Sequence, residues 1–182
     1  MIAIDRPAAI RRAMRDLVAE RGFHGASMHA VAEAAGVATG TAYVHYASKD
    51  ELVIATYLEV KSELADAVLA THDSTAPVFD QYRHVFKVTF DHMAREPERA
   101  RFLTQMEGSP YRDAAHQRLA ESEDRLIAVL IPLLETKLIE LPPEVIWAMS
   151  LGLAIHMAAS GIAISESELE RLVDATWRSI TV

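Results

Sequence analysis

The sequence contains no cysteine, so disulfide frameworks, thiolate metal sites and thiol nucleophiles are excluded. Aromatic residues make up only 7% of the 182 residues, glycine and proline number seven each, and runs rich in Val, Ile, Thr and Tyr are scarce. Few strands are therefore expected. Because 51% of the residues are hydrophobic, the chain is expected to bury a substantial core between helices. The predicted fold class is all-α.

Basic charge is also in short supply, and it is unevenly distributed. The net charge of the chain is -8. Residues 1–50 carry six Lys or Arg and five Asp or Glu, whereas residues 51–182 carry 12 Lys or Arg and 21 Asp or Glu. An acidic body repels phosphate, so any contact with nucleic acid is expected in the first part of the chain. We therefore predict two domains, a small one over residues 1–50 and a larger helical one over residues 51–182.

The N-terminal residues lack the basic-then-apolar order of a signal peptide, so secretion is not indicated and a cytoplasmic protein is expected. One uncharged run, 145–164, is long enough to cross a bilayer, with His156 its only titratable residue. The flanks of this run are acidic and lack the Lys or Arg that accompanies a membrane-spanning helix. We therefore expect a helix buried on all sides and no membrane contact. A membrane-anchored protein is the alternative.

Helical periodicity and capping signals predict about nine helices. Ser27 is expected to cap one of them, while Ser48 with Glu51 and Ser165 with Glu168 form the capping-box pattern. Pro132 is expected to bend the longest helix. The expected ranges are 7–21, 27–36, 38–46, 48–72, 78–95, 97–106, 111–140, 145–164 and 165–180.

Residues 27–49 have the organisation of a helix-turn-helix, in which one helix braces a second whose exposed side chains enter the major groove of DNA. The turn is Ala-Gly-Val at 35–37, where Gly36 tolerates a positive φ and Val37 packs back on the first helix. Gly40 lets the second helix approach phosphate closely, while Thr39 and Thr41 offer hydroxyls to base edges.

Three further side chains of this segment suit contacts to phosphate. Tyr43 and His45 can donate hydrogen bonds, and Lys49 stands at the start of the next helix, where its charge and the helix dipole both attract an anion. Arg11, Arg12 and Arg15 are expected to form a solvated face on the first helix.

The matching segments extend beyond this motif, and together they make residues 8–58 resemble the DNA-binding domain of the TetR family of bacterial transcriptional regulators. They are Ile10–Leu17, Glu20–Phe23, Ser27, Val31–Ala32, Ala35–Val37, Gly40–Tyr43, His45–Tyr46 and Ser48–Leu52. The resemblance implies contacts to an operator in double-stranded DNA. No metal or cofactor is expected, because the sequence has no HExxH motif and no pair of histidines four residues apart. The implied contact residues are Ser27, Thr39, Gly40, Thr41, Tyr43, Val44, His45 and Lys49.

Three positions depart from the family pattern. Ala38 stands where the family has a capping Ser, Ala42 replaces a larger apolar residue, and Tyr46 replaces Phe. Thr39 is expected to take over as the cap of the recognition helix.

Residues 59–182 resemble the family only in layout. That layout implies a pocket for an unknown small-molecule effector and a homodimer through residues 144–180, whose last two helices form a four-helix bundle with those of a second copy. Pocket candidates are apolar side chains and two histidines, each with core packing as its alternative role. They are Phe86, Phe90, Met93, Phe102, Met106, Tyr111, His116 and His156.

The favoured function is a ligand-responsive, homodimeric transcriptional regulator, expected to be a repressor, that binds a near-palindromic operator and uses residues 48–72 as a lever. A TetR-like protein controlled by a protein partner, or without any small-molecule effector, is the alternative. An all-α enzyme using His116 or His156 is disfavoured, because the sequence has no HExxH, GxSxG or phosphate-loop motif.

Overall fold

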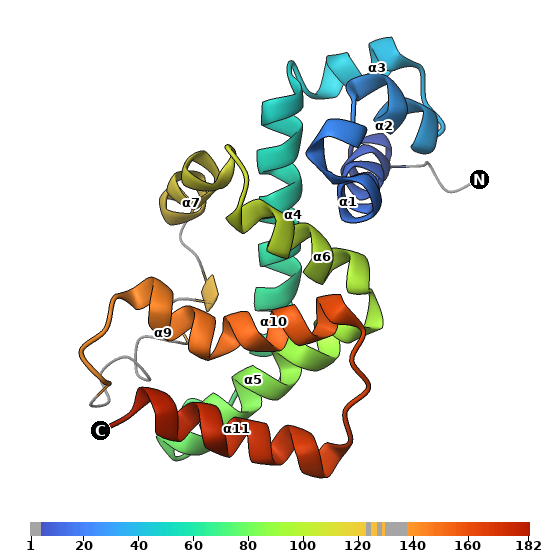
Figure 1. Cartoon of the computed structure of the whole chain (residues 1–182). Helices are drawn as coiled ribbons and strands as arrows, with labels where there is room; N and C mark the ends of the chain where they lie inside the picture. The colour runs from blue at the N-terminus through green and yellow to red at the C-terminus, as the bar shows by residue number, and fades with distance from the viewer. Residues whose placement is uncertain (1–4, 123–124, 127–128, 130–137) are drawn as a thin grey trace. The chain divides into compact units, whose positions relative to one another are not determined.

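The computed structural model describes residues 5–122, 125, 126, 129 and 138–182. Within these residues the regular structure is helical, apart from one isolated antiparallel bridge between Leu138 and Thr181. The all-α prediction is confirmed (Figure 1). The helices are α1 (Arg6–Gly25), α2 (Met28–Ala34), α3 (Thr39–His45), α4 (Lys49–Leu69), α5 (Val78–Arg95), α6 (Pro97–Glu107), α7 (Arg112–Glu121), α9 (Pro143–Met149), α10 (Leu151–Ser160) and α11 (Glu166–Ile180).

Most of the predicted helices are found within a few residues of their expected ends. α1 runs on to Gly25, but Gly22 has φ 70° and ψ 175°, so the helix is broken where the sequence predicted its end. Ser27 caps α2, and Ser165 with Glu168 forms a complete capping box on α11. The helix expected over 111–140 is described only as α7, and its predicted bend at Pro132 lies outside the described residues.

The single buried helix predicted over 145–164 was wrong. The backbone breaks between α9 and α10 at Ser150, with φ -119° and ψ -107°, and Gly161 ends α10 in the left-handed conformation. The Ser150 hydroxyl donates to the carbonyl oxygen of Ile146 at 2.7 Å, a local bond that competes with regular helix hydrogen bonding. A Cβ on Gly152 would lie 2.9 Å from the carbonyl oxygen of Trp147, so glycine permits this close approach.

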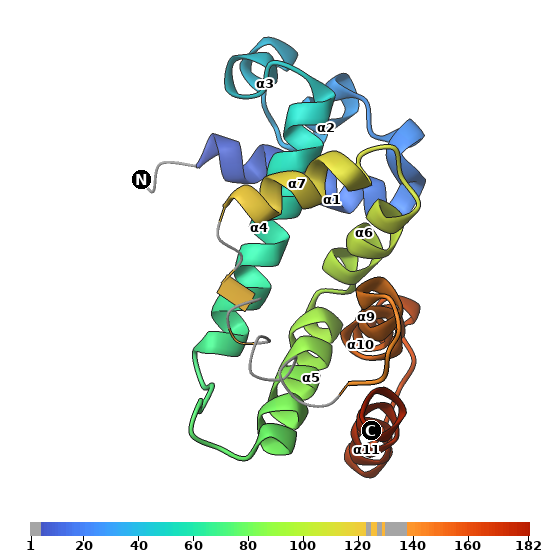
Figure 2. The same ribbon diagram turned by 90° about the vertical axis from the view of Figure 1, so that its left-hand side faces the viewer.

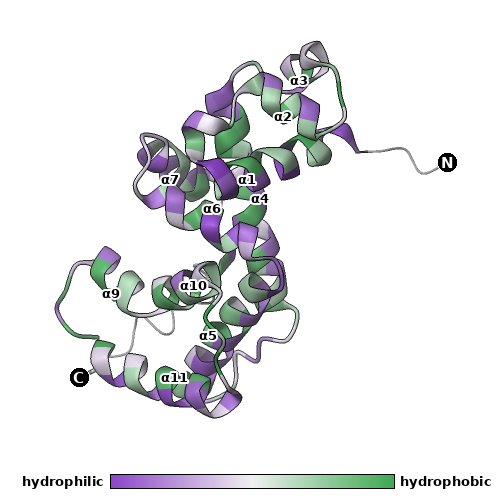
Figure 3. Ribbon diagram, turned by 45° about the vertical axis from the view of Figure 1, so that its right-hand side comes forward, coloured by the Kyte–Doolittle hydropathy of each residue, from purple (hydrophilic) through white to green (hydrophobic). Residues whose placement is uncertain are grey.

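Burial along this segment also differs from the expectation. α9 has no buried residue and His156 on α10 is exposed. Figure 3 colours much of α9 green, as expected for a hydrophobic helix whose side chains are left partly uncovered. Within the described residues, no helix combines the length and the apolar character needed to span a bilayer.

The chain forms two compact units. Unit 1 contains residues 5–61 and 101–122, and unit 2 contains residues 62–100 and the described residues from 125 onward. The predicted boundary between a DNA-binding domain and a helical body at residue 50 is a functional division and stays a prediction. The compact units follow packing, so they do not coincide with that boundary. The reason is that α6 and α7 pack with α1, although some 80 residues separate them in sequence.

Unit 1 is built on one apolar stripe of α1, where Ile10, Met14 and Val18 are fully buried at helical spacing. The ring of Phe23 packs against Phe102 and Tyr111, with centroids 6.3 and 5.0 Å apart. The side-chain amide of Gln105, on α6, donates to the carbonyl oxygen of Val18 at 2.8 Å. These contacts close the core beneath α2 and α3.

Unit 2 is organised around α5, whose buried residues recur every three or four positions. Figures 1 and 2 show α10 and α11 lying along α5, and each of them packs against it. Tyr82 donates to the hydroxyl of Thr176 at 2.8 Å, and its ring lies 5.0 Å from that of Trp177. Burial raises the pKa of Tyr82 to about 12, so the phenol remains a hydrogen-bond donor at neutral pH.

Candidate nucleic-acid interface

The turn between α2 and α3 is held as the sequence predicted. Gly36 has φ 68°, a conformation that L side chains rarely adopt, and the amide of Val37 donates to the carbonyl oxygen of Ala32 at 2.9 Å. The hydroxyl of Ser27 accepts from the amide of Ala30 at 3.2 Å. The relative direction of α2 and α3 is therefore set by the backbone of this turn, while the Ser27 cap fixes the start of α2.

α3 is anchored from one side and open on the other. Ala42 is its one buried residue, and Tyr46 directly after it is also buried. On the other side, Tyr43 is 51% exposed and Val44 82% exposed, and Gly40 and His45 are exposed as well. An exposed aromatic next to an exposed Val on a short helix indicates a surface made for contact rather than core.

The expected cap by Thr39 was wrong. Ala38 occupies the N-cap position of α3 without a side-chain hydrogen bond, and the amide of Thr41 donates to the carbonyl oxygen of Ala38 at 2.8 Å. Thr39 is the first residue of the helix, where its hydroxyl lies 3.2 Å from Nδ1 of His29. The hydroxyl is thus directed to α2 instead of its own helix.

Sequence reasoning missed His29. It is an exposed residue of α2, and it meets Thr39 only because the turn at 35–38 brings two helices together. Its position could have indicated a role in the interface, because His29 lies two residues after the capping Ser27 and within the same segment as the other predicted contacts. His29 therefore joins the candidate interface next to the residue predicted to read base edges.

The expectation of a solvated arginine face on α1 holds only for Arg12, which is exposed. Arg15 is buried and its Nε lies 2.8 Å from the carboxylate of Asp16. Arg11 donates from Nη1 to the phenol oxygen of Tyr46 and from Nη2 to Oε1 of Glu59, both at 2.6 Å. The hydrogen bond to Glu59 and the one to Tyr46 raise the pKa of Arg11 above its ordinary value, partly offset by burial.

Lys49 is also bound within the protein. Its ammonium donates to the carbonyl oxygen of Phe23, which ties the start of α4 to the last part of α1, after the break at Gly22. Ser48 caps α4 through the amide of Glu51 at 3.1 Å, and the Glu51 carboxylate accepts from the amide of Ala47 at 2.7 Å. The ammonium has two further N–H donors, so a contact from Lys49 to a phosphate stays a prediction.

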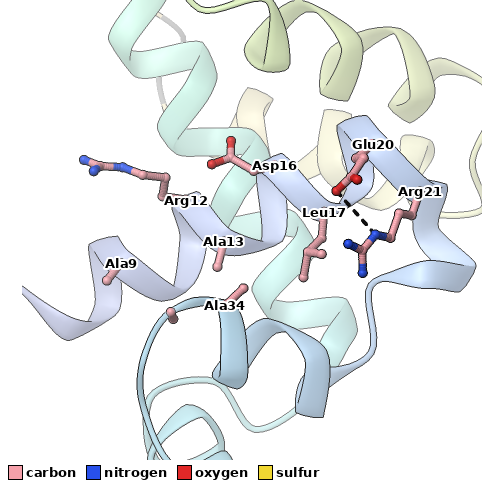
Figure 4. Close-up of a pocket in the computed structure, with 9 residues that line it drawn as sticks. Ala9, Arg12, Ala13, Asp16, Leu17, Glu20, Arg21 and Ala34 are labelled. Atoms are coloured by element: carbon pink, nitrogen blue, oxygen red, sulfur yellow. Dashed lines mark ion pairs between the residues drawn. The ribbon is translucent and has the colours of Figure 1, made fainter.

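A surface hollow of about 440 Å³ lies between α1 and the end of α2. Figure 4 shows Arg21 turned toward Glu20, whose carboxylate is 3.3 Å from the Arg21 Nε, and Arg12 pointing away from both. Ala9, Ala13, Asp16, Leu17, Ala34 and Ala35 complete its lining. The hollow mixes both signs of charge and shares no residue with the exposed face of α3.

The eight pocket candidates are divided between the two units. Phe86, Phe90 and Met93 are buried on α5 in unit 2, while Phe102 and Met106 are buried on α6 in unit 1. Tyr111 is half-buried against Phe23, and His116 and His156 are exposed. A second surface hollow, of about 390 Å³, is lined by residues of the 157–175 stretch and by none of the eight. The assignment of these residues to an effector pocket stays a prediction.

Residues 10–56 match the sequence profile described as "Bacterial regulatory proteins, tetR family". The matched range holds most of α1, the turn at Gly36 and the open face of α3. The chain belongs to the TetR family. It is a DNA-binding transcriptional regulator rather than an enzyme.

The curated relatives agree with this assignment. An uncharacterised HTH-type transcriptional regulator of Haemophilus influenzae is 27% identical over 168 residues, which cover 90% of this chain and 89% of that protein. The regulator UidR of Escherichia coli is 40% identical over 50 residues, 28% of this chain and 26% of its own length. Similarity to UidR is thus confined to a short segment.

Solved structures share the fold over nearly the whole chain. A TetR family regulator from Marinobacter aquaeolei superposes with a TM-score of 0.80 at 19% identity, covering 96% of this chain and 95% of that one. A TetR-family regulator from Haemophilus influenzae gives a TM-score of 0.70 at 25% identity, with 98% and 97% covered. The helical arrangement of TetR-family regulators therefore extends beyond the matched N-terminal segment.

Proposed function

We propose that this regulator binds a near-palindromic operator as a homodimer, with α3 of each subunit in the major groove of one half-site. The single observation that carries the proposal is the open face of α3, where Tyr43 and Val44 are exposed while Ala42 and Tyr46 hold the helix from behind. The proposed contacts are Ser27, His29, Thr39, Gly40, Thr41, Tyr43, Val44 and His45, with Lys49 supporting them through Phe23. Because operator DNA lies in the nucleoid, the proposed function implies that the protein acts in the cytoplasm, on the nucleoid.

The proposed dimer forms through residues 144–180. Unit 2 leaves apolar side chains uncovered there, with Val145 39% and Ile162 54% exposed. The neighbouring hollow of about 390 Å³ is lined by Met157, Ile162 and Leu172 among others. A second copy of residues 144–180 would cover these side chains, which supports a helical bundle between the subunits.

Selection of tight-binding DNA from a random pool, combined with sedimentation of the free protein, tests both statements. A palindromic motif with half-sites about one or two helical turns apart, bound by a dimer, is the expected result. A single half-site bound by a monomer would contradict the proposal.

We further propose that the regulator is a repressor released by a small-molecule effector held against α5. Within the part of the chain that the structure describes, three buried polar side-chain atoms of α5 have no hydrogen-bond partner: Gln81 Oε1, Thr89 Oγ1 and His92 Nε2. Burial lowers the pKa of His92, with Arg99 adding to the effect, so the imidazole is neutral at pH 7 and Nε2 is free to bond a ligand. Thr89 and His92 are neighbours on the helix surface, three residues apart.

A thermal-shift screen against a library of small organic molecules tests this second part. A molecule that stabilises the protein and lowers its operator affinity is expected, and Thr89→Val should reduce the stabilisation without changing the free protein's DNA binding. If no molecule stabilises the protein while operator binding is intact, control by a protein partner or without an effector is favoured instead.

A further inference from the structure

The recognition helix has few attachments to the rest of unit 1. It spans seven residues, its N-cap lacks a side-chain hydrogen bond, and Ala42 is its one buried residue. Tyr46, the residue that ends it, is only 7% exposed. The position of α3 therefore depends strongly on how Tyr46 is held.

Tyr46 is held through a single guanidinium. Arg11 Nη1 donates to the Tyr46 phenol oxygen and Nη2 donates to Glu59 Oε1 on α4, each at 2.6 Å. The phenol in turn lies 3.5 Å from the carbonyl oxygen of Pro7, at the limit of a hydrogen bond. One side chain of α1 thus joins the end of the recognition helix to the middle of α4.

The bridge is partly shielded from water, with the side chains of Arg11 and Glu59 22% and 29% exposed. Hydrogen bonds from a cation are shorter and stronger than neutral ones, and shielding preserves their strength. The third nitrogen of this guanidinium, Nε, is buried without a partner among the described residues. The geometry that bonds Arg11 to Tyr46 and Glu59 thus leaves one buried N–H without a hydrogen bond.

A phenylalanine at position 46 would fill the same space but would offer no acceptor to Arg11. The hydroxyl is thus needed for the bridge and not for packing. Each terminal nitrogen of Arg11 keeps a second N–H, but both nitrogens are already bonded within unit 1 and the side chain is only 22% exposed, so the guanidinium is poorly placed to bond a phosphate.

We infer that Arg11 is a positioning residue for operator binding. By joining Tyr46 to Glu59 it sets the direction of α3 relative to α4, without itself touching DNA. This role rests on the proposed binding of α3 to an operator half-site. It distinguishes Arg11 from Arg12, the next residue of α1, which is exposed.

The test uses the full-length protein and its selected operator, with Tyr46→Phe, Glu59→Gln and the double variant. Operator affinity is measured at several salt concentrations well below the melting temperature, and the melting temperature is measured separately. Each single variant is expected to weaken operator binding by roughly tenfold at every salt concentration. The loss of operator affinity in the double variant should be much smaller than the product of the two single-variant losses, since both changes break the same bridge.

Arg11→Met, with Arg12→Met as the matched control, separates positioning from phosphate contact. Arg11→Met is expected to weaken binding like Tyr46→Phe while leaving the salt dependence of wild type unchanged. A slope lower by about 1 would identify Arg11 as a phosphate contact and overturn the inference. Lower melting temperatures with unchanged operator affinity would also overturn it, because the bridge would then be structural only. A wild-type protein that selects no operator would refute the proposed function instead.

Discussion

Nδ1 of His29 lies 3.2 Å from the hydroxyl of Thr39, which joins the exposed side of α2 to the first residue of α3. A threonine hydroxyl has one proton, and its partner decides whether that proton is used within the protein or offered to a base. We therefore expect His29→Ala to change which base is preferred opposite Thr39, as Thr39→Ala does. Stability should change little, because the hydrogen bond is exposed.

Binding to a set of operators in which each base pair is varied in turn measures this effect. Tyr43→Phe is the control, since loss of a phosphate contact is expected to weaken all sequences about alike. The prediction is contradicted if His29→Ala also weakens all sequences alike and leaves the base preference intact.

Gly36 and Gly40 lie four residues apart, and alanine is expected to have opposite effects on stability at the two positions. Gly36 has φ 68° and open space where a methyl group would lie, so Gly36→Ala should cost about 1–2 kcal/mol through the backbone alone. Gly40 is helical and also open, so Gly40→Ala should stabilise the protein by up to about 1 kcal/mol. Urea unfolding of Gly36→Ala and Gly40→Ala measures the two changes in the free energy of unfolding.

Titration with operator DNA measures how Gly40→Ala changes DNA affinity. Gly40→Ala is expected to weaken DNA binding despite its higher stability, because the new methyl stands at the exposed start of α3. Unchanged operator affinity in Gly40→Ala would mean that the backbone there does not approach phosphate closely.

Lys49→Met is expected to destabilise unit 1. The ammonium donates to the carbonyl oxygen of Phe23, and a hydrogen bond from a charged donor contributes about 1.5–3 kcal/mol. Thermal unfolding measures the loss, with Arg12→Met as a control that removes an exposed cation. If Lys49→Met left stability unchanged but lowered the salt slope of operator binding by about 1, the ammonium would be a phosphate contact.

Operator affinity should fall with salt less steeply than for a strongly basic protein. Several fixed cations of unit 1 already face partners in the protein: Arg11 faces Glu59, Arg15 faces Asp16, and Lys49 the Phe23 carbonyl. A plot of log affinity against log salt is expected to have a slope shallower than about -6, whereas a slope near about -10 would contradict the prediction.

Glu170 on α11 should make stability depend on pH in the acid range. The hydrogen bond from Arg83, followed by the one from Lys87, lowers the pKa of Glu170 to about 2. A carboxylate whose pKa is lower when folded stabilises the protein above its ordinary value of 4.5, and that contribution is lost as the pH falls through about 2. Glu170→Gln should therefore be less stable than wild type at pH 7, with the difference shrinking below about pH 4.5.

Chemical unfolding at a series of pH values from about 7 to about 2 checks this prediction. The control is Glu166→Gln, since Glu166 contacts the same Lys87 from a side chain that is 72% exposed. Equal and pH-independent losses in both variants would show that the α5–α11 ion pairs do not carry the effect.

Much of this fold could be predicted from the sequence because it depends on neighbours along the chain. The spacing of Ile10, Met14 and Val18 defines the buried face of α1, Ser165 with Glu168 starts α11, and Gly36 makes the turn before α3. The resemblance to a TetR-type DNA-binding domain rests on such local signals within residues 8–58, and it is confirmed by the family match over residues 10–56.

Tertiary structure decided what the charged and polar side chains do. Arg11 meets Tyr46 and Glu59, which lie 35 and 48 residues away, and Lys49 meets a backbone carbonyl 26 residues before it. The break at Ser150 likewise depends on one close backbone approach that Gly152 allows. Periodicity and capping record which side of a helix is buried, but they do not record which distant group a long side chain reaches. Only the folded chain brings those groups together.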